Sequence, residues 1–287
     1  TIFQIKYPIN GEPLISIVIP NKDHVEDLRR CITSIEKKST WKNYEIVVVE
    51  NNSVEQSIRD YYKELESDPK VKIVTYEGGF NYSRINNVGV KETKGEYLLF
   101  LNNDTEVISP DWMEQLLMYA QRKDVGAVGA KLYYADNTIQ HAGVVIGLGA
   151  HRSAGHTHYK MPREHLGYMG RLCYAQDVTA VTGACLMVKK SIYEEVDGLD
   201  ESFTISLNDV DLCLKIREKG YLNIFTPFAE LYHYESKTRG MEEGEKLRRY
   251  ERECALFRDK WKEQLDAGDP YYNPNFSLDY SDFTLRF

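Results

Sequence analysis

Residues 97–104 read YLLFLNND. The side chains of residues 97–101 show no polar alternation, as expected for a strand that is covered on both faces. The apolar run stops abruptly at two amides and a carboxylate, Asn102, Asn103 and Asp104. Ligands of open parallel sheets bind beyond the carboxyl ends of the strands. The stretch therefore predicts an α/β fold with a polar site where a buried strand ends.

Similar apolar runs recur on both sides of this stretch and alternate with amphipathic segments up to residue 134. This alternation is typical of strand–helix units around a mainly parallel sheet. We expect strands over residues 14–19, 45–49, 71–74, 97–101 and 126–134. We expect helices over residues 25–35 and 82–92. Another is expected to begin at a capping box of Ser53 and Gln56, and a fourth at Ser109 and Pro110.

The second half of the chain is less regular. Residues 136–177 contain glycines and histidines but few periodic apolar positions, which predicts an irregular excursion that forms a wall or lid of a site. We expect a strand over residues 178–188, a short helix from Ser191, and helices over residues 208–219 and 242–264. The aromatic segment 271–276 is expected to pack back onto the body of the protein.

The composition excludes several classes of protein. The chain has 287 residues, with 36 basic and 44 acidic side chains, and its net charge of −8 argues against a nucleic-acid partner. Its five cysteines show no Cys-x-x-Cys spacing, so we expect neither a disulfide framework nor a zinc ribbon, and we expect a cytoplasmic location. No apolar run reaches the ~20 residues that span a bilayer. Because the sequence starts at Thr1, we expect a piece of a longer polypeptide with partner domains.

Polar residues follow three of the expected strands, at the carboxyl ends, which lie along one edge of the sheet. They are Asn21 and Asp23, then residues 50–52 (ENN), then residues 102–104 (NND). Turn formation explains each cluster taken singly, because Asn and Asp are common turn residues. Three clusters at successive strand ends favour a binding site.

The carboxylates suggest two chemical roles. Asp104, with Asn102 two residues before it, offers the oxygen ligands that Mg²⁺ and Mn²⁺ prefer. Asp209 lies in a second acidic segment, residues 208–211, where it either caps a helix or serves as a base. His233 follows an expected strand end and is either a further metal ligand or a packed core histidine.

Four histidines in and near the irregular segment raise the question of zinc. The spacing of His151, His156, His158 and His165 matches no compact zinc motif, and no cysteine lies near them. We expect them to supply polar lining to an acceptor groove.

Five segments in a fixed order resemble a known family. They are SIVIPN (16–21), VVENNS (48–53), LFLNNDTE (99–106), VTGAC (181–185) and NDVDLC (208–213). Together they are similar to the family 2 inverting glycosyltransferases of the GT-A fold, and in particular to rhamnosyltransferase-like enzymes of bacterial surface polysaccharide synthesis. The resemblance covers residues 13–240.

The resemblance implies a division of the chain and of its site. Residues 1–240 form the GT-A domain, with a nucleotide-sugar half (1–134) and a smaller, mixed acceptor half (135–240), and residues 241–287 form a helix and an aromatic tail that pack on it. The general base is Asp209. The residues implied to bind the nucleotide are Pro20, Asn21, Asp23, Glu50, Asn52, Asn87, Asn102 and Asn103. Those implied to bind Mn²⁺ or Mg²⁺ are Asp104, Asn102 and His233. Those implied to bind the acceptor are Gly183, Ala184 and Asp211.

The implied activity is metal-dependent, inverting hexosyl transfer. The donor is a UDP- or dTDP-sugar, with rhamnose suggested by analogy, and the acceptor is a glycan or a lipid-linked saccharide. A lipid-linked acceptor implies peripheral association with the inner face of the cell membrane. The sequence departs from the family pattern where Glu50 replaces an aspartate and where Asn102 replaces the first carboxylate of the Asp-x-Asp motif.

Two other functions remain open at the level of sequence. A nucleotidyltransferase shares a nucleotide-binding sheet and a metal carboxylate, but residues 21–24 (NKDH) lack the glycines of a phosphate loop. A non-catalytic sugar- or nucleotide-binding module is favoured by the amides Asn102 and Asn208, whereas the intact Asp104 and Asp209 argue against it.

Overall fold

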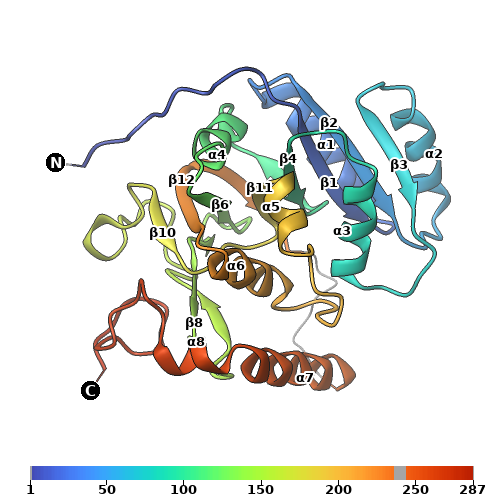
Figure 1. Ribbon diagram of the computed structural model, residues 1–287. Helices are drawn as coiled ribbons and strands as arrows, with labels where there is room; N and C mark the ends of the chain where they lie inside the picture. The colour runs from blue at the N-terminus through green and yellow to red at the C-terminus, as the bar shows by residue number, and fades with distance from the viewer. Residues whose placement is uncertain (1, 236–243, 287) are drawn as a thin grey trace.

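The structure is a computed structural model that describes residues 2–235 and 244–286 (Figure 1). Its strands are β1 (Ile15–Asn21), β2 (Tyr44–Glu50), β3 (Val71–Thr75), β4 (Tyr97–Leu101), β5 (Thr105–Val107), β6 (Val125–Tyr133), β7 (Ile139–His141), β8 (Val144–Ile146), β9 (Ala154–His156), β10 (Gln176–Val178), β11 (Cys185–Lys189) and β12 (Leu222–His233). Its helices are α1 (Val25–Lys38), α2 (Gln56–Leu65), α3 (Tyr82–Lys91), α4 (Trp112–Ala120), the short 3₁₀ turn η1 (Tyr168–Gly170), α5 (Lys190–Glu195), α6 (Asn208–Glu218), α7 (Glu245–Lys260) and α8 (Lys262–Ala267).

A large mixed sheet forms the centre of the molecule. Its strand order in the described residues is β10-β12-β6-β11-β4-β1-β2-β3, with β5 beside β12 and β7 beside β6, while β8 and β9 pair separately. The strands β3, β2, β1 and β4 run parallel, which confirms the sequence prediction for this half. Beyond β4 the sheet is mixed, because β11 runs antiparallel to both of its neighbours.

Helices cover both faces of this sheet. Successive residues of β1 point to opposite faces: Ile17 belongs to an apolar cluster with α1, α2 and α4, whereas Val18 belongs to a cluster with α3, α5, α6 and α7. In α3, a side chain on Gly89 would come within 2.7 Å of Val18 and Val49, so the glycine lets this helix lie directly on the sheet. Burial on both faces explains the unbroken apolar runs of the central strands.

The strand expected over residues 178–188 is wrong. The chain forms β10 at the sheet edge and β11 between β4 and β6, so residues 179–184 must cross over β6. They do so at Gly129, where an added methyl group would lie 2.4 Å from the Cβ of Val181. Because Ala180 and Val181 are buried in this crossing, the apolar pattern shows no break.

Two expected helix starts are also corrected. Ser53 does not cap α2; its hydroxyl donates to Glu50 at 2.5 Å, and the helix begins only at Gln56. Ser109 does not cap α4, which begins at Trp112; its hydroxyl accepts a hydrogen bond from the backbone N–H of Glu230 at 2.8 Å. In both places the serine hydroxyl joins chain segments near the sheet instead of capping a helix.

The charged C-terminal helix is broken into α7 and α8. The break falls at Trp261, whose buried indole donates from Nε1 to Oδ1 of Asp211 on α6 at 2.8 Å. Figure 1 shows α7, in red, below α6, and both helices contribute to one apolar cluster. The expected helix start at residue 242 and the boundary at residue 240 lie outside the described residues.

The aromatic tail packs onto the body, as expected. Tyr272, Phe276 and Phe283 cluster with one another, and Phe283 stacks on Tyr168 with the ring centroids 5.3 Å apart. The segment expected to be irregular contains the short elements β7 to β10 and η1. Across residues 2–235 and 244–286, no helix has the length and apolar character needed to cross a membrane.

Candidate active site

A cleft of about 850 Å³ opens at the carboxyl ends of β1 and β4 and at the N-terminus of α6. Its volume lies within the ~300–1,000 Å³ that is usual for small-ligand sites. The irregular segment forms part of its wall through Val144 and residues 154–156. The cleft brings together most of the predicted site residues, namely Pro20, Asn21, Asp23, Asn102, Asn103, Asp104, Gly183, Ala184, Asp209 and His233.

Asp104 and His233 meet in this cleft because β5 and β12 pair antiparallel, with Thr105 opposite His233. Both side chains are buried, and Oδ1 of Asp104 lies 3.1 Å from Nε2 of His233. The amide nitrogen of Asn102 lies 3.1 Å from the same Nε2. The three predicted metal ligands therefore converge, although His233 is far from the other two in sequence.

Hydrogen bonds behind His233 fix which of its nitrogens faces the cleft. Nδ1 lies 2.6 Å from Oε1 of Gln140, and the amide nitrogen of Gln140 donates to Glu235 at 3.2 Å. With its nitrogen engaged in this way, Gln140 accepts at Oε1, so Nδ1 of His233 carries the proton. In this tautomer Nε2 has a lone pair, to which the amide nitrogen of Asn102 can donate and which a cation beside Asp104 would use instead.

This arrangement fits a divalent cation. A lone pair and a carboxylate 3.1 Å apart are held together favourably by a positive charge between them, and imidazole with carboxylate oxygen suits Mn²⁺. The described residues contain no group of three or more His, Cys, Asp or Glu side chains placed to hold a metal. Oxygen atoms of a bound ligand are therefore needed to complete the coordination of such an ion.

Asn21 and Asn103 also line the cleft, and a hydrogen bond joins them. The amide of Asn103 donates to Oδ1 of Asn21 at 2.6 Å, and Asn21 donates to the hydroxyl of Tyr62 at 2.7 Å. That hydroxyl in turn donates to Glu50 at 2.6 Å. Glu50 itself does not line the cleft; it holds Asn21 in place through Tyr62.

The remaining predicted nucleotide residues have structural contacts. Asp23 lines the cleft, and its Oδ1 accepts from the backbone N–H groups of Val54 and Glu55 at 2.7 and 2.9 Å. Asn52 lies outside the cleft lining and donates to the carbonyl of Gly78. Asn87 is also outside it, bound to Leu199 and to Tyr193. The structure therefore does not bring Asn52 and Asn87 to the other site residues.

Asp209 lies in the first turn of α6 and is anchored at both oxygens. Oδ2 accepts from the backbone N–H of Gly183 at 2.8 Å, and Oδ1 accepts from that of Val210 at 2.8 Å. Each carboxylate oxygen can accept a second hydrogen bond, so the group keeps room for a ligand hydroxyl. A side chain on Gly183 would lie 3.2 Å from the hydroxyl of Tyr82 and 3.4 Å from Cβ of Asp209, so glycine keeps this contact close.

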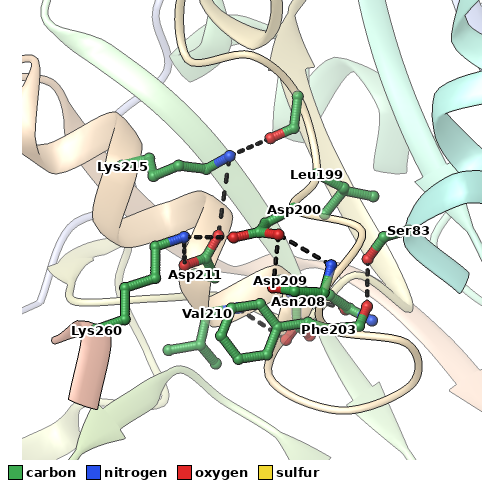
Figure 2. A network of polar contacts seen from close by, with 12 residues as sticks. Ser83, Leu199, Asp200, Phe203, Asn208, Asp209, Val210, Asp211, Lys215 and Lys260 are labelled. Carbon is green, nitrogen blue, oxygen red and sulfur yellow. Dashed lines mark hydrogen bonds and ion pairs between the residues drawn. The ribbon is translucent and has the colours of Figure 1, made fainter. Parts of the chain in front are cut away.

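Asp211 is not part of the cleft, which corrects its expected role on the acceptor side. Its side chain is fully buried, accepts from the indole of Trp261 and pairs with Lys260 at 2.7 Å. Figure 2 shows Lys260 between the carboxylates of Asp200 and Asp211. Burial opposes ionisation of Asp200, but hydrogen bonds from Lys260 and Ser202 outweigh it and lower the pKa of Asp200 to about 2. Residues two apart on a helix point in different directions, so Asp209 and Asp211 cannot share one site.

Helix α7 also holds the loop that precedes Asp209. The buried carboxylate of Glu253 accepts from the backbone N–H groups of Thr204, Ile205 and Ser206 at 2.9, 3.2 and 2.8 Å. Ile205 and Ser206 line the cleft. Sequence reasoning missed Glu253, because nothing in a charged helix distinguishes one glutamate from its solvated neighbours.

We predict that Glu253→Gln destabilises the protein. An amide cannot accept at both positions, so at least one part-buried N–H of the loop loses its partner, at a cost of about 1–3 kcal/mol. Thermal unfolding of this variant is expected to show a lower Tm than the wild type. Glu251→Gln, at an exposed position on the same helix, is the matched control, and equal Tm values for the two variants would contradict the prediction.

Solved structures share the fold of this chain. One is the crystal structure of GalNAc-T7 with UDP, GalNAc and Mn²⁺; it matches with a TM-score of 0.69 and 18% identity over 90% of this chain and 50% of that one. Another is the mannosyltransferase PcManGT from Pyrobaculum calidifontis in complex with GDP-Man and Mn²⁺, with a TM-score of 0.59 and 12% identity over 92% and 81% of the two chains. The fold is the GT-A fold of glycosyltransferases.

Sequence comparison gives the family. Residues 16–197 match the sequence model of Glycosyl transferase family 2, and the chain belongs to this family. It is 46% identical over 286 residues to the uncharacterized protein y4gI of Sinorhizobium fredii, covering 99% of this chain and 31% of that protein. It is 35% identical over 290 residues to the O-antigen biosynthesis protein RfbC of Myxococcus xanthus, covering 99% and 22%. The chain thus spans less than a third of the length of these two relatives.

A shorter match involves a protein with a more specific name. Over 77 residues the chain is 29% identical to the N-acetylglucosaminyl-diphospho-decaprenol L-rhamnosyltransferase of Mycobacterium tuberculosis, covering 27% of this chain and 25% of that one.

Proposed function

We propose that this chain transfers a sugar, with inversion, from a UDP- or dTDP-sugar to a hydroxyl group of a glycan or lipid-linked saccharide. The observation that carries the proposal is the pairing of two sites in one cleft: the buried Asp104–His233 pair and the anchored carboxylate of Asp209. Membership of Glycosyl transferase family 2 supports the transfer of a sugar and leaves nucleotidyl transfer without support.

The names of two relatives suggest the biological setting. One relative is named for O-antigen biosynthesis and another for rhamnosyl transfer to a diphospho-decaprenol acceptor. By analogy we propose bacterial surface polysaccharide synthesis, with rhamnose as the first donor sugar to test. A lipid-linked acceptor places this step at the inner face of the cell membrane, and partner domains are expected because the relatives are much longer.

The donor half of the cleft supplies binding groups. Pro20, Asn21, Asp23 and Asn103 line the part of the cleft that we assign to the nucleotide. Asp104 and His233, with Asn102 beside them, would hold Mn²⁺ or Mg²⁺. When bound, the cation neutralises negative charge on the departing diphosphate.

The acceptor half of the cleft supplies the general base. As the acceptor oxygen attacks the anomeric carbon from the side opposite the diphosphate, Asp209 takes its proton. The bond from the anomeric carbon to the diphosphate oxygen breaks, a glycosidic bond forms, and the single displacement inverts the configuration. The absence of a side chain on Gly183 and the small side chain of Ala184 let the acceptor approach Asp209 closely.

An assay of nucleotide release distinguishes transfer from passive binding. The purified chain is incubated with Mn²⁺, with UDP- and dTDP-sugars and with saccharide acceptors, and the release of UDP or dTDP is measured. We expect acceptor-dependent release from one class of donor. Nucleotide binding without release from any donor would favour the non-catalytic binding module.

Gln140 offers a test of the metal assignment that does not depend on activity. Gln140→Leu removes the acceptor of the Nδ1 proton of His233, and loss of such an outer partner typically weakens metal affinity ~10–100-fold. We expect a loss of this size in Mn²⁺ titrations of the nucleotide complex. Gln56→Leu, at an exposed position on α2, is the matched control and is expected to retain affinity. Unchanged Mn²⁺ affinity in the leucine variant would contradict the assignment of His233.

A further inference from the structure

A second cavity, which we call the side cavity, adjoins the cleft. It has a volume of about 450 Å³ and is lined by residues that include Tyr134, Tyr159, Glu235 and Asp279. It shares five lining residues with the cleft, among them Thr182 and His156, so the two spaces are adjacent. Sequence reasoning gave no role to Tyr134, Tyr159 or Asp279.

The side cavity adjoins both halves of the cleft, because it shares His233 with the proposed metal site and Thr182 with the acceptor side. Thr182 lines both spaces and directly precedes Gly183, whose N–H holds Asp209. An acceptor sugar that presents its hydroxyl to Asp209 therefore has the side cavity within reach of its remaining atoms. A longer acceptor can extend into this space without leaving the protein surface.

The walls of the side cavity combine aromatic rings with oxygen-bearing groups. The rings of Tyr134 and Tyr159 meet edge to face with centroids 6.0 Å apart, and their hydroxyls lie 3.1 Å apart. Tyr159 is 42% exposed, so its ring is available to a ligand. The side chain of Asp279 is tied to Arg152 at 2.5 Å, which fixes the C-terminal tail against the loop between β8 and β9.

The charge of the side-cavity lining favours a neutral sugar of an acceptor over a diphosphate. Among the described residues, the side-cavity lining includes carboxylates but no lysine or arginine; Lys160 contacts the Tyr159 ring at 5.4 Å without belonging to the lining. Arg152 compensates the charge of Asp279, but the carboxylate oxygens of Asp279 and Glu235 can still accept hydrogen bonds from sugar hydroxyls, whereas the described lining offers no cation to a diphosphate. Aromatic rings pack against the apolar face of a pyranose.

We propose that the side cavity is a subsite for a neutral sugar of the acceptor, so that the acceptor carries at least two sugar units. This inference rests on the proposed function and deepens it. The first sugar presents its hydroxyl to Asp209, and the next sugar packs on Tyr159 and donates its hydroxyls to Asp279 and Glu235. A lipid diphosphate, where the acceptor has one, lies outside this subsite.

The test uses the purified chain with saturating Mn²⁺ and whichever of UDP or dTDP binds. The affinity of this complex is measured for each of an array of defined mono-, di- and trisaccharides of rhamnose, N-acetylglucosamine, glucose, galactose and mannose. We expect at least one di- or trisaccharide to bind more tightly than its terminal monosaccharide by ~3–10-fold, the size of one aromatic contact. Tyr159→Ala is expected to remove this gain and to leave nucleotide affinity unchanged.

Two control variants define the role of the ring. Tyr159→Phe keeps the ring and is expected to keep most of the gain. Tyr280→Ala removes an exposed tyrosine of the C-terminal tail that lines neither cavity, and it is expected to change nothing. Equal binding of mono- and oligosaccharides, an unaffected Tyr159→Ala variant, or nucleotide binding with no saccharide bound would overturn the subsite. Failure to bind either nucleotide would instead overturn the proposed function.

Discussion

Asp209→Asn is expected to lower the turnover of sugar transfer by at least ~100-fold, because a positioned general base typically contributes 10²–10⁴-fold. The amide oxygen can still accept from Gly183, but the N–H of Val210 then loses its side-chain partner, so we expect a lower Tm together with a nucleotide affinity close to that of the wild type. Turnover is measured as acceptor-dependent release of UDP or dTDP, and affinity by calorimetry on the same preparation.

A matched variant separates this effect from a change of charge on the helix. Glu218→Gln removes an exposed carboxylate at the other end of α6 and is expected to leave turnover unchanged. Near-normal turnover in Asp209→Asn would assign the base to another residue. Loss of both turnover and nucleotide affinity would show instead that the substitution disturbs the whole cleft.

Asp104→Ala is expected to abolish the metal-dependent part of nucleotide binding. It removes the carboxylate of the proposed metal site, so the loss in Mn²⁺ affinity should exceed the ~10–100-fold that removal of an outer partner costs. His233 alone then faces the cation. Mn²⁺ is titrated into the nucleotide complex, and the fraction bound is followed by electron paramagnetic resonance.

The control for Asp104 is an aspartate of the surface. Asp259→Ala, at an exposed position on α7, is expected to bind Mn²⁺ and nucleotide as the wild type does. Wild-type Mn²⁺ affinity in Asp104→Ala would place the metal elsewhere or show that the site binds nucleotide without one.

The parallel half of the fold could be predicted because burial on both faces leaves a strong local signal. β4 is apolar at every position and ends at polar residues, and the strand-end rule then locates Asp104 correctly in the cleft. The crossing at residues 179–184 gave no such signal, because a buried connection is as apolar as a strand.

The partners of the site residues could not be predicted, because they come from distant parts of the chain. Gln140 meets His233 across 93 residues, and Glu253 meets Thr204 across 49. Neither glutamine nor glutamate has a local pattern that reveals such a contact. Asp211 is different: helical periodicity alone separates its direction from that of Asp209, and this signal was available in the sequence.

The family resemblance named residues that mostly line one cleft, but it did not give the function of every matched position. Glu50 falls on a nucleotide position of the pattern, yet it acts on the cleft through other residues: through Tyr62 on Asn21, and through Ser53 on Asp23. Asn87 instead ties α3 to the segment around Leu199. Short motifs identify a position in the chain, whereas side-chain direction depends on the packing around it.

Calorimetric titration of the wild-type chain with UDP and with dTDP, in Mn²⁺ and again in EDTA, tests the central claim most directly. The account predicts that at least one of the two nucleotides binds in Mn²⁺ and that EDTA weakens or removes this binding. Failure of both nucleotides to bind in Mn²⁺ would contradict the assignment of the cleft as a nucleotide-sugar site.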